Sequence, residues 1–215
     1  MKAAGSAAAV GTCQHAEVQD RRIARSKRAI RVAFLELMSE RGLDGFTVNE
    51  LCDRADINRG TFYNHYSDKD AVLKALEMEF FDGLKDFEEQ LLGVSMAQVA
   101  LCNASKKPLP LLVNLFDYLR AQGDFLHAVL GDGGDPGFDA YMRDAIFAKL
   151  VESILHERYR NSDDPFVGYY IAFFASAYMG VISKWVETGM KESSQEMARV
   201  TMRLLFIKPG ESIKL

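Results

Sequence analysis

The segment 47–69 constrains the fold of this chain more than any other stretch. Thr47 followed by Glu50 has the spacing of a capping box, in which each side chain satisfies a free backbone amide at a helix start. This pattern predicts a helix of about two turns that ends near Asp56. Asn58 is a good N-cap for a second short helix. Because only about three residues would separate the two helices, the segment predicts a helix-turn-helix unit.

The second helix is predicted over Arg59 to His65, with Phe62 toward the core. The apolar side of the unit comprises Leu51, Ala55, Ile57, Phe62 and Tyr66. On a helical wheel the outward positions are Gly60, Thr61, Tyr63 and Asn64. Gly60 lets the backbone come close to duplex DNA, and the Asn64 amide can pair with a base edge. The Thr61 methyl or hydroxyl suits either a base or a phosphate.

Three further side chains near this unit are predicted phosphate contacts: Tyr63, His65 and Lys69. Lys69 falls in the first turn of the next helix, for which Ser67 is the expected cap with Asp70 three residues on. From pattern alone, the alternative is a three-helix unit with a purely structural role.

A basic cluster begins the preceding helix, predicted over Arg21 to Arg41 and ended by Gly42. The cluster comprises Arg21, Arg22, Arg25, Lys27 and Arg28. The buried stripe of the same helix is predicted from Ile30, Phe34, Leu37 and Met38. The cluster is either a solvated helix end or a set of phosphate contacts, and its place before a helix-turn-helix favours phosphate.

The run T-V-x-x-L-x-x-x-A-x-I-x-x-G-T-F-Y-x-H-Y-x-x-K in residues 47–69 closely resembles the signature of the tetracycline-repressor (TetR) family. This resemblance implies a DNA-binding domain over about 21–68. It implies that Thr47 contacts phosphate at a helix start and that Gly60, Thr61 and Asn64 face the groove. It also implies that Tyr63, His65 and Lys69 contact phosphates. The full set of predicted DNA contacts is Arg25, Lys27, Arg28, Thr47, Val48, Arg59, Gly60, Thr61, Tyr63, Asn64, His65 and Lys69.

Asp56 departs from that signature, because the family usually has glycine after the first helix of the motif. Aspartate tolerates the left-handed conformation of a helix end better than most residues. We therefore expect the turn to be kept at a small cost.

The composition predicts a helical intracellular protein of one or two domains: 215 residues, 48% hydrophobic, with five prolines. No apolar run is expected to reach the roughly 18 residues of a membrane span. Three widely spaced cysteines, Cys13, Cys52 and Cys102, fit a reduced cytoplasm. The net charge of −4 is uneven, because residues 1–66 hold 10 Lys/Arg against 8 Asp/Glu and residues 67–215 hold 16 against 22. The basic excess lies where DNA contact is predicted.

The rest of the chain predicts an all-α fold, with a disordered arm over residues 1–20 and an effector-binding and dimerisation domain over 69–215. The predicted helices of this domain are Asp70–Leu92, Pro108–Ala121, Phe125–Leu130, Pro136–Arg160, Pro165–Thr188 and a last helix, capped by Ser193 with Glu196, that ends near Phe206. The stretch 95–107 is either a loop or a short helix.

No catalytic or metal site is predicted. The aspartates Asp132, Asp135 and Asp139 lack the EF-hand spacing, and Asp135 is expected to cap a helix. His127 and His156 lie on separate helices and form no known catalytic pattern. An enzyme and a cofactor are therefore not expected.

The segment Pro165–Thr188 is apolar almost all round, which a soluble monomer does not cover easily. Two hairpins made of this helix and the last one can close a four-helix interface about a twofold axis. The predicted interface comprises Phe166, Tyr170, Phe174, Tyr178, Val181, Trp185, Met197 and Leu204. A twofold dimer also presents two recognition helices to a pseudo-palindromic operator.

The stretch from Leu130 to Phe138, together with Trp185, Gly189 and Ser193, resembles the regulatory half of a Firmicutes-type branch of the family. The resemblance implies an effector enclosed by the middle helices. Candidate lining residues are Leu112, Phe116, Leu119, Phe125, Phe147, Tyr169, Phe173 and Met179, all of which also suit a filled core.

These observations predict a dimeric DNA-binding regulator, expected to be a repressor released by a small hydrophobic or amphipathic effector. One alternative replaces the small effector with a protein partner, which a filled core would favour over an open cavity. Another is an enzyme or small-molecule-binding protein with a structural N-terminal unit. The sequence fixes neither the operator, the effector, the regulated genes nor the sign of regulation.

Overall fold

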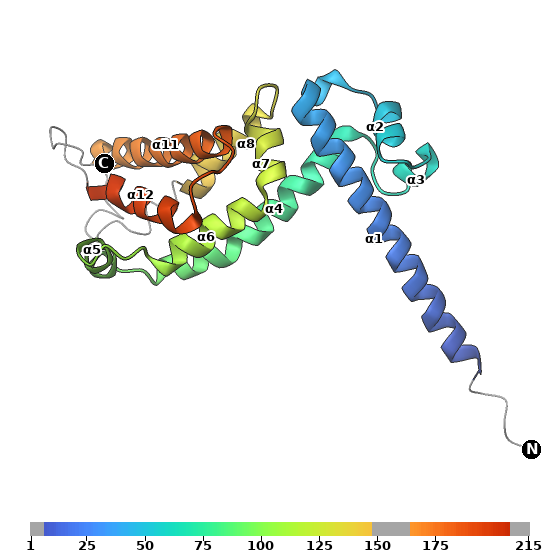
Figure 1. Ribbon diagram of the computed structural model, residues 1–215, viewed down its shortest axis with the longest axis horizontal. Helices are drawn as coiled ribbons and strands as arrows, with labels where there is room; N and C mark the ends of the chain where they lie inside the picture. Colours follow the sequence, from blue (N-terminus) through green and yellow to red (C-terminus); the bar gives the residue numbers. More distant parts are fainter. Residues whose placement is uncertain (1–6, 148–163, 207–215) are drawn as a thin grey trace, which may run out of the picture. The chain divides into compact units, whose positions relative to one another are not determined.

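The computed structural model describes residues 7–147 and 164–206, and every regular element in these two ranges is helical (Figure 1). This confirms the all-α prediction for the described residues. The chain forms two compact units, Met1–Leu76 and Glu77–Leu215. The division lies inside the helix α4 (Lys69–Leu92), whose first residues belong to the first unit. The predicted domain boundary at residue 68 stays a prediction.

The first unit is built around a short hydrophobic core. Its elements are α1 (Ala7–Arg41), η1 (Leu43–Gly45), α2 (Val48–Arg54), α3 (Arg59–Tyr63) and the start of α4 (Lys69–Leu92). The buried residues include Ile30, Phe34, Leu37, Met38, Phe46, Leu51, Phe62, Val72, Leu73 and Leu76. The predicted stripe of the first helix is therefore confirmed as core. Phe62 anchors the short helix α3 to this core, because its ring is fully buried whereas the residues before and after it are not.

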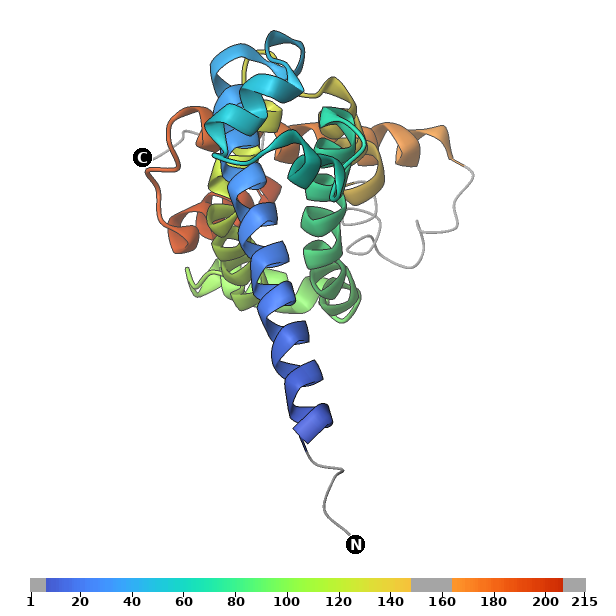
Figure 2. The same ribbon diagram turned by 90° about the vertical axis from the view of Figure 1, so that its right-hand side faces the viewer.

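Helix α1 begins at Ala7, whereas a disordered arm was expected up to residue 20. It continues without interruption to Arg41, and its N-terminal half extends beyond α2 and α3 (Figure 1, Figure 2). Alanine has the highest helix propensity of all residues, so the Ala-rich start continues the helix more readily than it ends it.

The cap of α4 is Asp68, not the expected Ser67. The Asp68 carboxylate accepts a hydrogen bond from the Ala71 amide at 2.7 Å, and the Ser67 hydroxyl donates to the same carboxylate at 3.0 Å. A carboxylate is a stronger acceptor than a hydroxyl at a helix start, where the helix dipole also favours negative charge.

The second unit continues with the rest of α4 and further helices. These are α5 (Met96–Ala104), α6 (Pro110–Ala121), α7 (Gly123–Leu130), α8 (Pro136–Tyr141), the wider-turned η2 (Met142–Phe147), α11 (Pro165–Glu187) and α12 (Ser194–Phe206). The predicted caps Asp135 and Asp164 accept hydrogen bonds from Gly137 and Phe166, each at 2.9 Å. The helix predicted over 136–160 changes to the wider turn at Met142, and its remainder lies outside the described residues.

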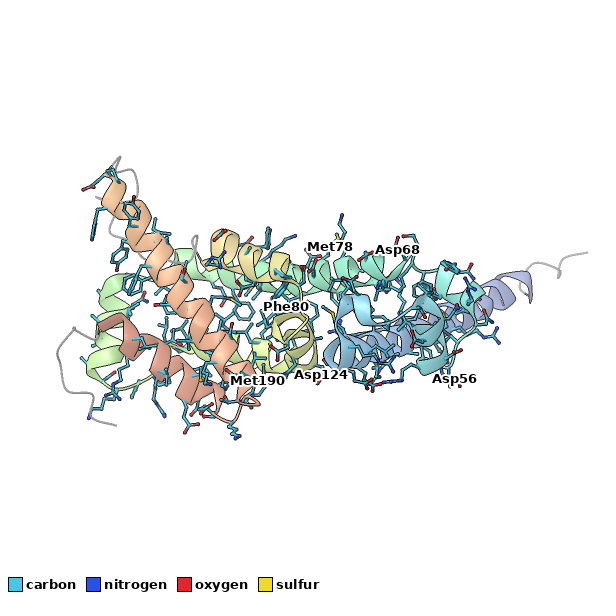
Figure 3. All side chains as sticks on the ribbon, turned by 90° about the horizontal axis from the view of Figure 1, so that it is seen from above. Asp56, Asp68, Met78, Phe80, Asp124 and Met190 are labelled. Atoms are coloured by element: carbon cyan, nitrogen blue, oxygen red, sulfur yellow. The ribbon has the colours of Figure 1, made fainter. Side chains whose placement is uncertain are left out.

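Aromatic side chains fill the core of the second unit. Phe80 of α4 lies inside this unit (Figure 3), with its ring 5.3 Å from that of Phe125 and 5.5 Å from that of Phe138. The Tyr118 hydroxyl donates to the Phe80 carbonyl at 2.7 Å, directly over Gly83. A side chain on Gly83 would collide with the Tyr118 ring, so this glycine sets how closely α4 and α6 approach.

The turn between α11 and α12 is held from α6. Arg120 donates to the carbonyl of Met190 at 2.9 Å and to the carbonyl of Glu192, and its guanidinium lies 5.1 Å from the centre of the Trp185 ring. Trp185 itself donates to the Glu192 carbonyl at 3.1 Å and packs edge-on against Phe116 at 5.4 Å. These contacts place Trp185 in the core of the second unit.

Helix α11 is long and apolar enough to cross a membrane, contrary to the expectation that no segment reaches this length. An 18-residue stretch within it has a mean hydropathy of 1.5, and 17% of that stretch is buried. Its buried face comprises Ala175, Met179, Ile182, Trp185 and Val186. The other face is an apolar surface that the described residues of the second unit leave exposed.

Candidate nucleic-acid interface

The start of α2 is fixed by the predicted capping box. The Thr47 hydroxyl accepts from the Glu50 amide at 3.3 Å, and the Glu50 carboxylate accepts from the Thr47 amide at 2.8 Å. Arg41 of α1 also donates to Glu50 at 2.9 Å. Hydrogen bonds from the Thr47 backbone and side chain, followed by that from Arg41, lower the pKa of Glu50 below its ordinary value. Thr47 is exposed and Val48 half-buried, so both stand at the edge of the unit.

The end of α2 is tied to α1 by Arg54. Its guanidinium donates to both oxygens of Glu40, at 2.9 and 3.0 Å, and to Glu36 at 3.3 Å. The hydrogen bonds that Arg54 donates to Glu40 and Glu36 raise the pKa of Arg54 further above its usual range. A bidentate arginine–carboxylate pair has a defined geometry as well as charge complementarity, so it holds α2 in a defined orientation on α1. Sequence reasoning missed this role, because the partners lie 14 and 18 residues away on another helix.

The turn between α2 and α3 passes through Asp56, whose φ of 52° is left-handed, as predicted. Asp56 is exposed at the surface of the first unit (Figure 3). Asn58 then caps α3, accepting from the Thr61 amide at 2.8 Å and from the Thr61 hydroxyl at 3.1 Å. Because the Thr61 hydroxyl donates its proton to Asn58, its methyl group and remaining acceptor capacity are what it can offer a ligand.

The outer face of α3 differs from the prediction at Thr61. Gly60, Tyr63 and Asn64 are exposed, whereas Thr61 and His65 are half-buried. Arg59 lies at the first helical position and is exposed. Its guanidinium donates to the Tyr63 hydroxyl at 3.5 Å and lies 5.8 Å from the centre of the Tyr63 ring. The face therefore offers the Asn64 amide and the Tyr63 hydroxyl at predicted outward positions, and the guanidinium of Arg59, which was predicted as a DNA contact without a stated orientation.

Lys69 has an internal role that sequence reasoning did not predict. Its ammonium donates to the carbonyls of Leu43 and Phe46, at 2.6 and 3.2 Å, and lies 5.4 Å from the centre of the Phe46 ring. Asp44 is 3.8 Å away. The side chain thus fixes the η1 turn that leads into α2, and its predicted phosphate contact stays a prediction.

The basic side chains of α1 flank an open groove. Arg25, Lys27 and Arg28 are exposed, and none of the three has an ion-pair partner among the described residues. The groove has a volume of about 360 Å³ and lies between α1 and the end of α2. It is lined by Arg25, Arg28, Ala29, Val32, Ala33, Glu36, Arg54 and Ala55. Sequence reasoning identified the two α1 arginines but not the groove.

The predicted effector residues whose side chains the structure describes differ in their burial. Phe116, Leu119, Phe125 and Met179 are buried in the core, and Leu112 is half-buried beside the cluster of Val99, Leu109 and Met202. Tyr169 and Phe173 are 76% and 67% exposed, contrary to an internal lining role. Phe147 ends η2, and its side chain lies outside the described residues. Packing against the neighbouring helices decides which face of α11 is buried, and this packing cannot be predicted from composition.

The predicted dimer residues also divide into two groups. Trp185 and Met197 are buried within the protomer and so belong to its core rather than to an interface. Four are half-buried: Tyr170, Phe174, Tyr178 and Val181. The Phe174 ring lies 4.6 Å from the ring of Tyr170 and 6.5 Å from that of Tyr178. Burial raises the pKa of Tyr170, and burial followed by the nearby Tyr170 raises that of Tyr178. Phe166 and Leu204 are exposed, at 67% and 40%.

In the described part of the chain, no group of three or more His, Cys, Asp or Glu side chains lies close enough together to hold a metal ion. Cys52 is buried and Cys102 half-buried, both as free thiols, and burial raises the pKa of Cys52. The chemistry on offer in the first unit is therefore that of hydrogen-bonding and cationic groups displayed on short capped helices.

Comparison with known proteins identifies this arrangement. Residues 30–76, which include α2, α3 and the start of α4, match the family described as bacterial regulatory proteins, tetR family. Residues 106–206 match the transcriptional regulator C-terminal region of such proteins. The chain belongs to the TetR family. It is thus a DNA-binding transcriptional regulator.

Curated relatives are similar over short stretches. A 58-residue stretch, 26% of this chain, is 34% identical to the uncharacterized HTH-type transcriptional regulator YxbF of Bacillus subtilis and covers 15% of it. A 72-residue stretch, 34% of this chain, is 35% identical to the class D tetracycline repressor of Escherichia coli and to the class H repressor of Photobacterium damsela subsp. piscicida, covering 33% of each. The matches thus span a third or less of these relatives.

Solved TetR-type structures share the fold. A TetR transcriptional regulator from Streptococcus agalactiae is 24% identical with a TM-score of 0.54, over 88% of this chain and 98% of that one. The dihydroxyacetone kinase operon activator DhaS is 18% identical with a TM-score of 0.53, over 84% and 93%. The fatty acid degradation regulator FadR from Bacillus halodurans is 16% identical with a TM-score of 0.51, over 84% and 94%.

Proposed function

We propose that this TetR-family regulator is a cytoplasmic repressor that binds a pseudo-palindromic operator as a homodimer. The observation that carries the proposal is the outer face of α3, where Arg59, Gly60, Tyr63 and Asn64 are exposed around the buried Phe62. Residues at the start of a recognition helix are those that reach base edges in the major groove. The exposed arginines of α1 supply the cationic groups for phosphates.

The dimer is supported by the uncovered face of α11. Its exposed positions recur at steps of three and four residues: Tyr169, Ala172, Phe173, Ser176, Ala177 and Gly180. Val200 and Leu204 of α12 are also exposed, at 41% and 40%. Small residues in the middle of such a stripe allow two helices to approach closely. We propose that a second copy of the chain, related by a twofold axis, covers this face and sets the half-site spacing.

Release by a ligand is the second part of the proposal, and the aromatic packing among the described residues bears on the kind of ligand. Phe116 packs on Trp185, and Phe125 packs on both Phe80 and Phe138. A small effector in this part of the second unit would have to displace or reorganise these rings. This packing favours the alternative in which a protein partner binds the second unit and shifts the operator affinity, although the repressor role is the same in both cases.

The test is fluorescence anisotropy of the purified protein on DNA that flanks its own gene, at two salt concentrations. We expect tight, competitor-resistant and salt-sensitive binding that is lost in Tyr63→Ala. Tyr141→Ala, an exposed tyrosine of the second unit, serves as the matched control and should bind as the unchanged protein does. A reporter driven by the bound DNA then gives the sign, because a repressor lowers its output.

Specific binding with a rise in reporter output would overturn the repressor role and leave the DNA-binding function intact. Binding that is equal for flanking and unrelated DNA would contradict an operator beside the gene. Addition of a library of small hydrophobic compounds tests the effector, and a concentration-dependent fall in anisotropy is the result that supports a small ligand.

A further inference from the structure

The guanidinium groups of the first unit differ in what they contact. Arg41 donates to Glu50, and Arg54 is shared between Glu40 and Glu36. Arg59 makes no ion pair in the described ranges, and its hydrogen-bond partner there is the neutral hydroxyl of Tyr63. Its charge is therefore not neutralised by the described residues. Most of its five N–H donors remain available to a ligand.

Tyr63 restricts where the Arg59 guanidinium can be. The two residues are four positions apart on α3, a spacing that brings side chains together on one helix face. The distance of 5.8 Å from the guanidinium carbon to the ring centre lies within the range of cation–π attraction. The 3.5 Å donor distance to the Tyr63 hydroxyl is long for a hydrogen bond, so the ring face and the hydroxyl act together. An arginine held in this way loses less rotamer freedom when it binds.

The neighbours of Arg59 leave room for it to reach a base. Gly60 has no side chain and is exposed, and it lies beside the side-chain amide oxygen of Asn58, the residue that caps α3. Thr61 turns its hydroxyl back to the same Asn58. The first exposed side chain of α3 that extends outward with several donors is therefore that of Arg59. A planar guanidinium pairs with two acceptors at once, and guanine offers O6 and N7 side by side in the major groove.

We propose that Arg59 recognises one guanine in each operator half-site, and that Tyr63 is a positioning residue that orients the Arg59 guanidinium. The inference rests on the proposed operator binding and adds a base identity to it. Tyr63 keeps its own hydroxyl proton when it accepts from Arg59, so it can still donate to a phosphate. The two roles assigned to Tyr63 are compatible.

The test begins with selection of bound sequences from a random duplex pool by the full-length protein, Arg59→Gln and Arg28→Gln. The unchanged protein should enrich a twofold-symmetric site with an invariant guanine in each half. Arg59→Gln should keep the half-site spacing but lose that guanine, with adenine favoured because glutamine pairs with adenine. Arg28→Gln is the matched charge control. It should weaken binding to all sequences alike and leave the selected site unchanged.

The second measurement replaces that guanine with 7-deazaguanine, which lacks the N7 acceptor. The unchanged protein should lose affinity about 10-fold, whereas Arg59→Gln should lose none. Tyr63→Phe keeps the ring and removes the hydroxyl. If Tyr63 positions Arg59, this variant lowers the ratio of affinities for guanine and 7-deazaguanine sites; a residue that only contacts phosphate or supports the fold lowers both affinities equally.

The outcomes separate the two levels of the proposal. An Arg59→Gln protein that selects the same site, with the same sensitivity to 7-deazaguanine, would overturn the role of Arg59 while the regulator still binds its operator. An unchanged ratio in Tyr63→Phe would overturn the positioning role alone. A native protein that enriches no sequence would overturn specific operator binding, and the base contact with it.

Discussion

At the scale of single residues, Lys69 shows how a side chain suited to a phosphate is used within the protein. Its ammonium joins the Leu43 and Phe46 carbonyls, at 2.6 and 3.2 Å, and so closes the turn before α2. Carbonyls that lose a charged donor in a partly buried site are left poorly satisfied. The residue therefore contributes to the fold of the helix-turn-helix whether or not DNA is present.

Replacing Lys69 by methionine should lower the free energy of unfolding by about 1 to 3 kcal/mol in the absence of DNA. The methionine keeps the length of the side chain but donates no hydrogen bond. Urea denaturation followed by circular dichroism measures the change, and Lys74→Met, an exposed lysine of the same helix, is the control. Unchanged stability with weakened DNA binding would show that Lys69 serves the phosphate alone.

The left-handed backbone of Asp56 makes a second prediction at this scale. Because glycine has no Cβ to collide at a φ of 52°, Asp56→Gly should raise the free energy of unfolding by roughly 0.5 kcal/mol, net of the entropy glycine loses. Asp56→Ala keeps the Cβ without a polar side chain and should lower it by about 1 kcal/mol. Thermal melts that give the opposite order would contradict the strain.

At the scale of elements, α2 and α12 both begin with a capping box that contains a glutamate. Thr47 with Glu50 opens α2, and Ser193 with Glu196 opens α12, where the Ser193 amide and hydroxyl both donate to Glu196 at 2.7 Å. In both boxes the hydrogen bonds lower the pKa of the glutamate. A carboxyl whose pKa is lowered on folding stabilises the fold above its unfolded pKa of about 4.3, and this contribution is lost as the pH falls through the folded pKa.

The stability of the regulator should therefore fall with decreasing pH below about 4.3, and Glu50→Gln should make this fall shallower. Glutamine can still complete a capping box but does not titrate. Unfolding midpoints measured from pH 6 down to pH 3 give the slope, with exposed Glu89→Gln as control. An identical pH profile for Glu50→Gln and the unchanged protein would rule out this linkage.

The approach of α4 to α6 gives a further element-scale prediction. Gly83→Ala should lower the free energy of unfolding by about 1 to 3 kcal/mol, because the new methyl group meets the Tyr118 ring and forces the helices apart. Gly168→Ala in α11 is the matched control, since a Cβ there meets nothing within 4 Å. Equal stabilities for the two variants, measured by denaturation, would show that the Tyr118 ring moves aside freely.

The elements that sequence analysis predicted well are those with local signals. Caps such as Asn58 and Asp135 act within three residues, so the residue types at fixed spacing were enough to place them. The choice of face on α11 was not predictable in this way. Trp185 is buried because Arg120 and Phe116 of α6 meet it, and contacts between distant helices leave no mark on the spacing of apolar residues. The same reason explains the unpredicted partners of Lys69 and Arg54.

At the scale of the whole molecule, the exposed stripe of α11 has to be covered by something. A helix with this hydropathy and so little burial suits either lipid or another protein surface. The stripe has its small residues Ser176, Ala177 and Gly180 in the middle, and exposed apolar residues of α12 are present as well. A second copy of the chain fits both features, because it would bury the two helices together.

Gly180→Leu should convert the proposed dimer to a monomer. A Cβ at this position meets nothing within 4 Å inside the protomer, so the leucine is tolerated there but keeps a second helix away. Light scattering coupled to size-exclusion chromatography measures the mass, and Ala104→Leu, on the exposed side of α5, is the control. An unchanged protein that is monomeric and floats with phosphatidylglycerol vesicles would show that lipid covers the stripe instead.

The exposed ion pairs of Arg54 bear on how salt experiments with this regulator should be interpreted. Added salt screens Arg54 from Glu36 and Glu40, just as it competes with arginines for phosphates. Added salt thus weakens the ion pairs that orient α2 on α1. The slope of the logarithm of DNA affinity against the logarithm of salt concentration should therefore be steeper than the number of contacted phosphates predicts. This excess slope should disappear when Arg54, Glu36 and Glu40 are replaced together by neutral residues.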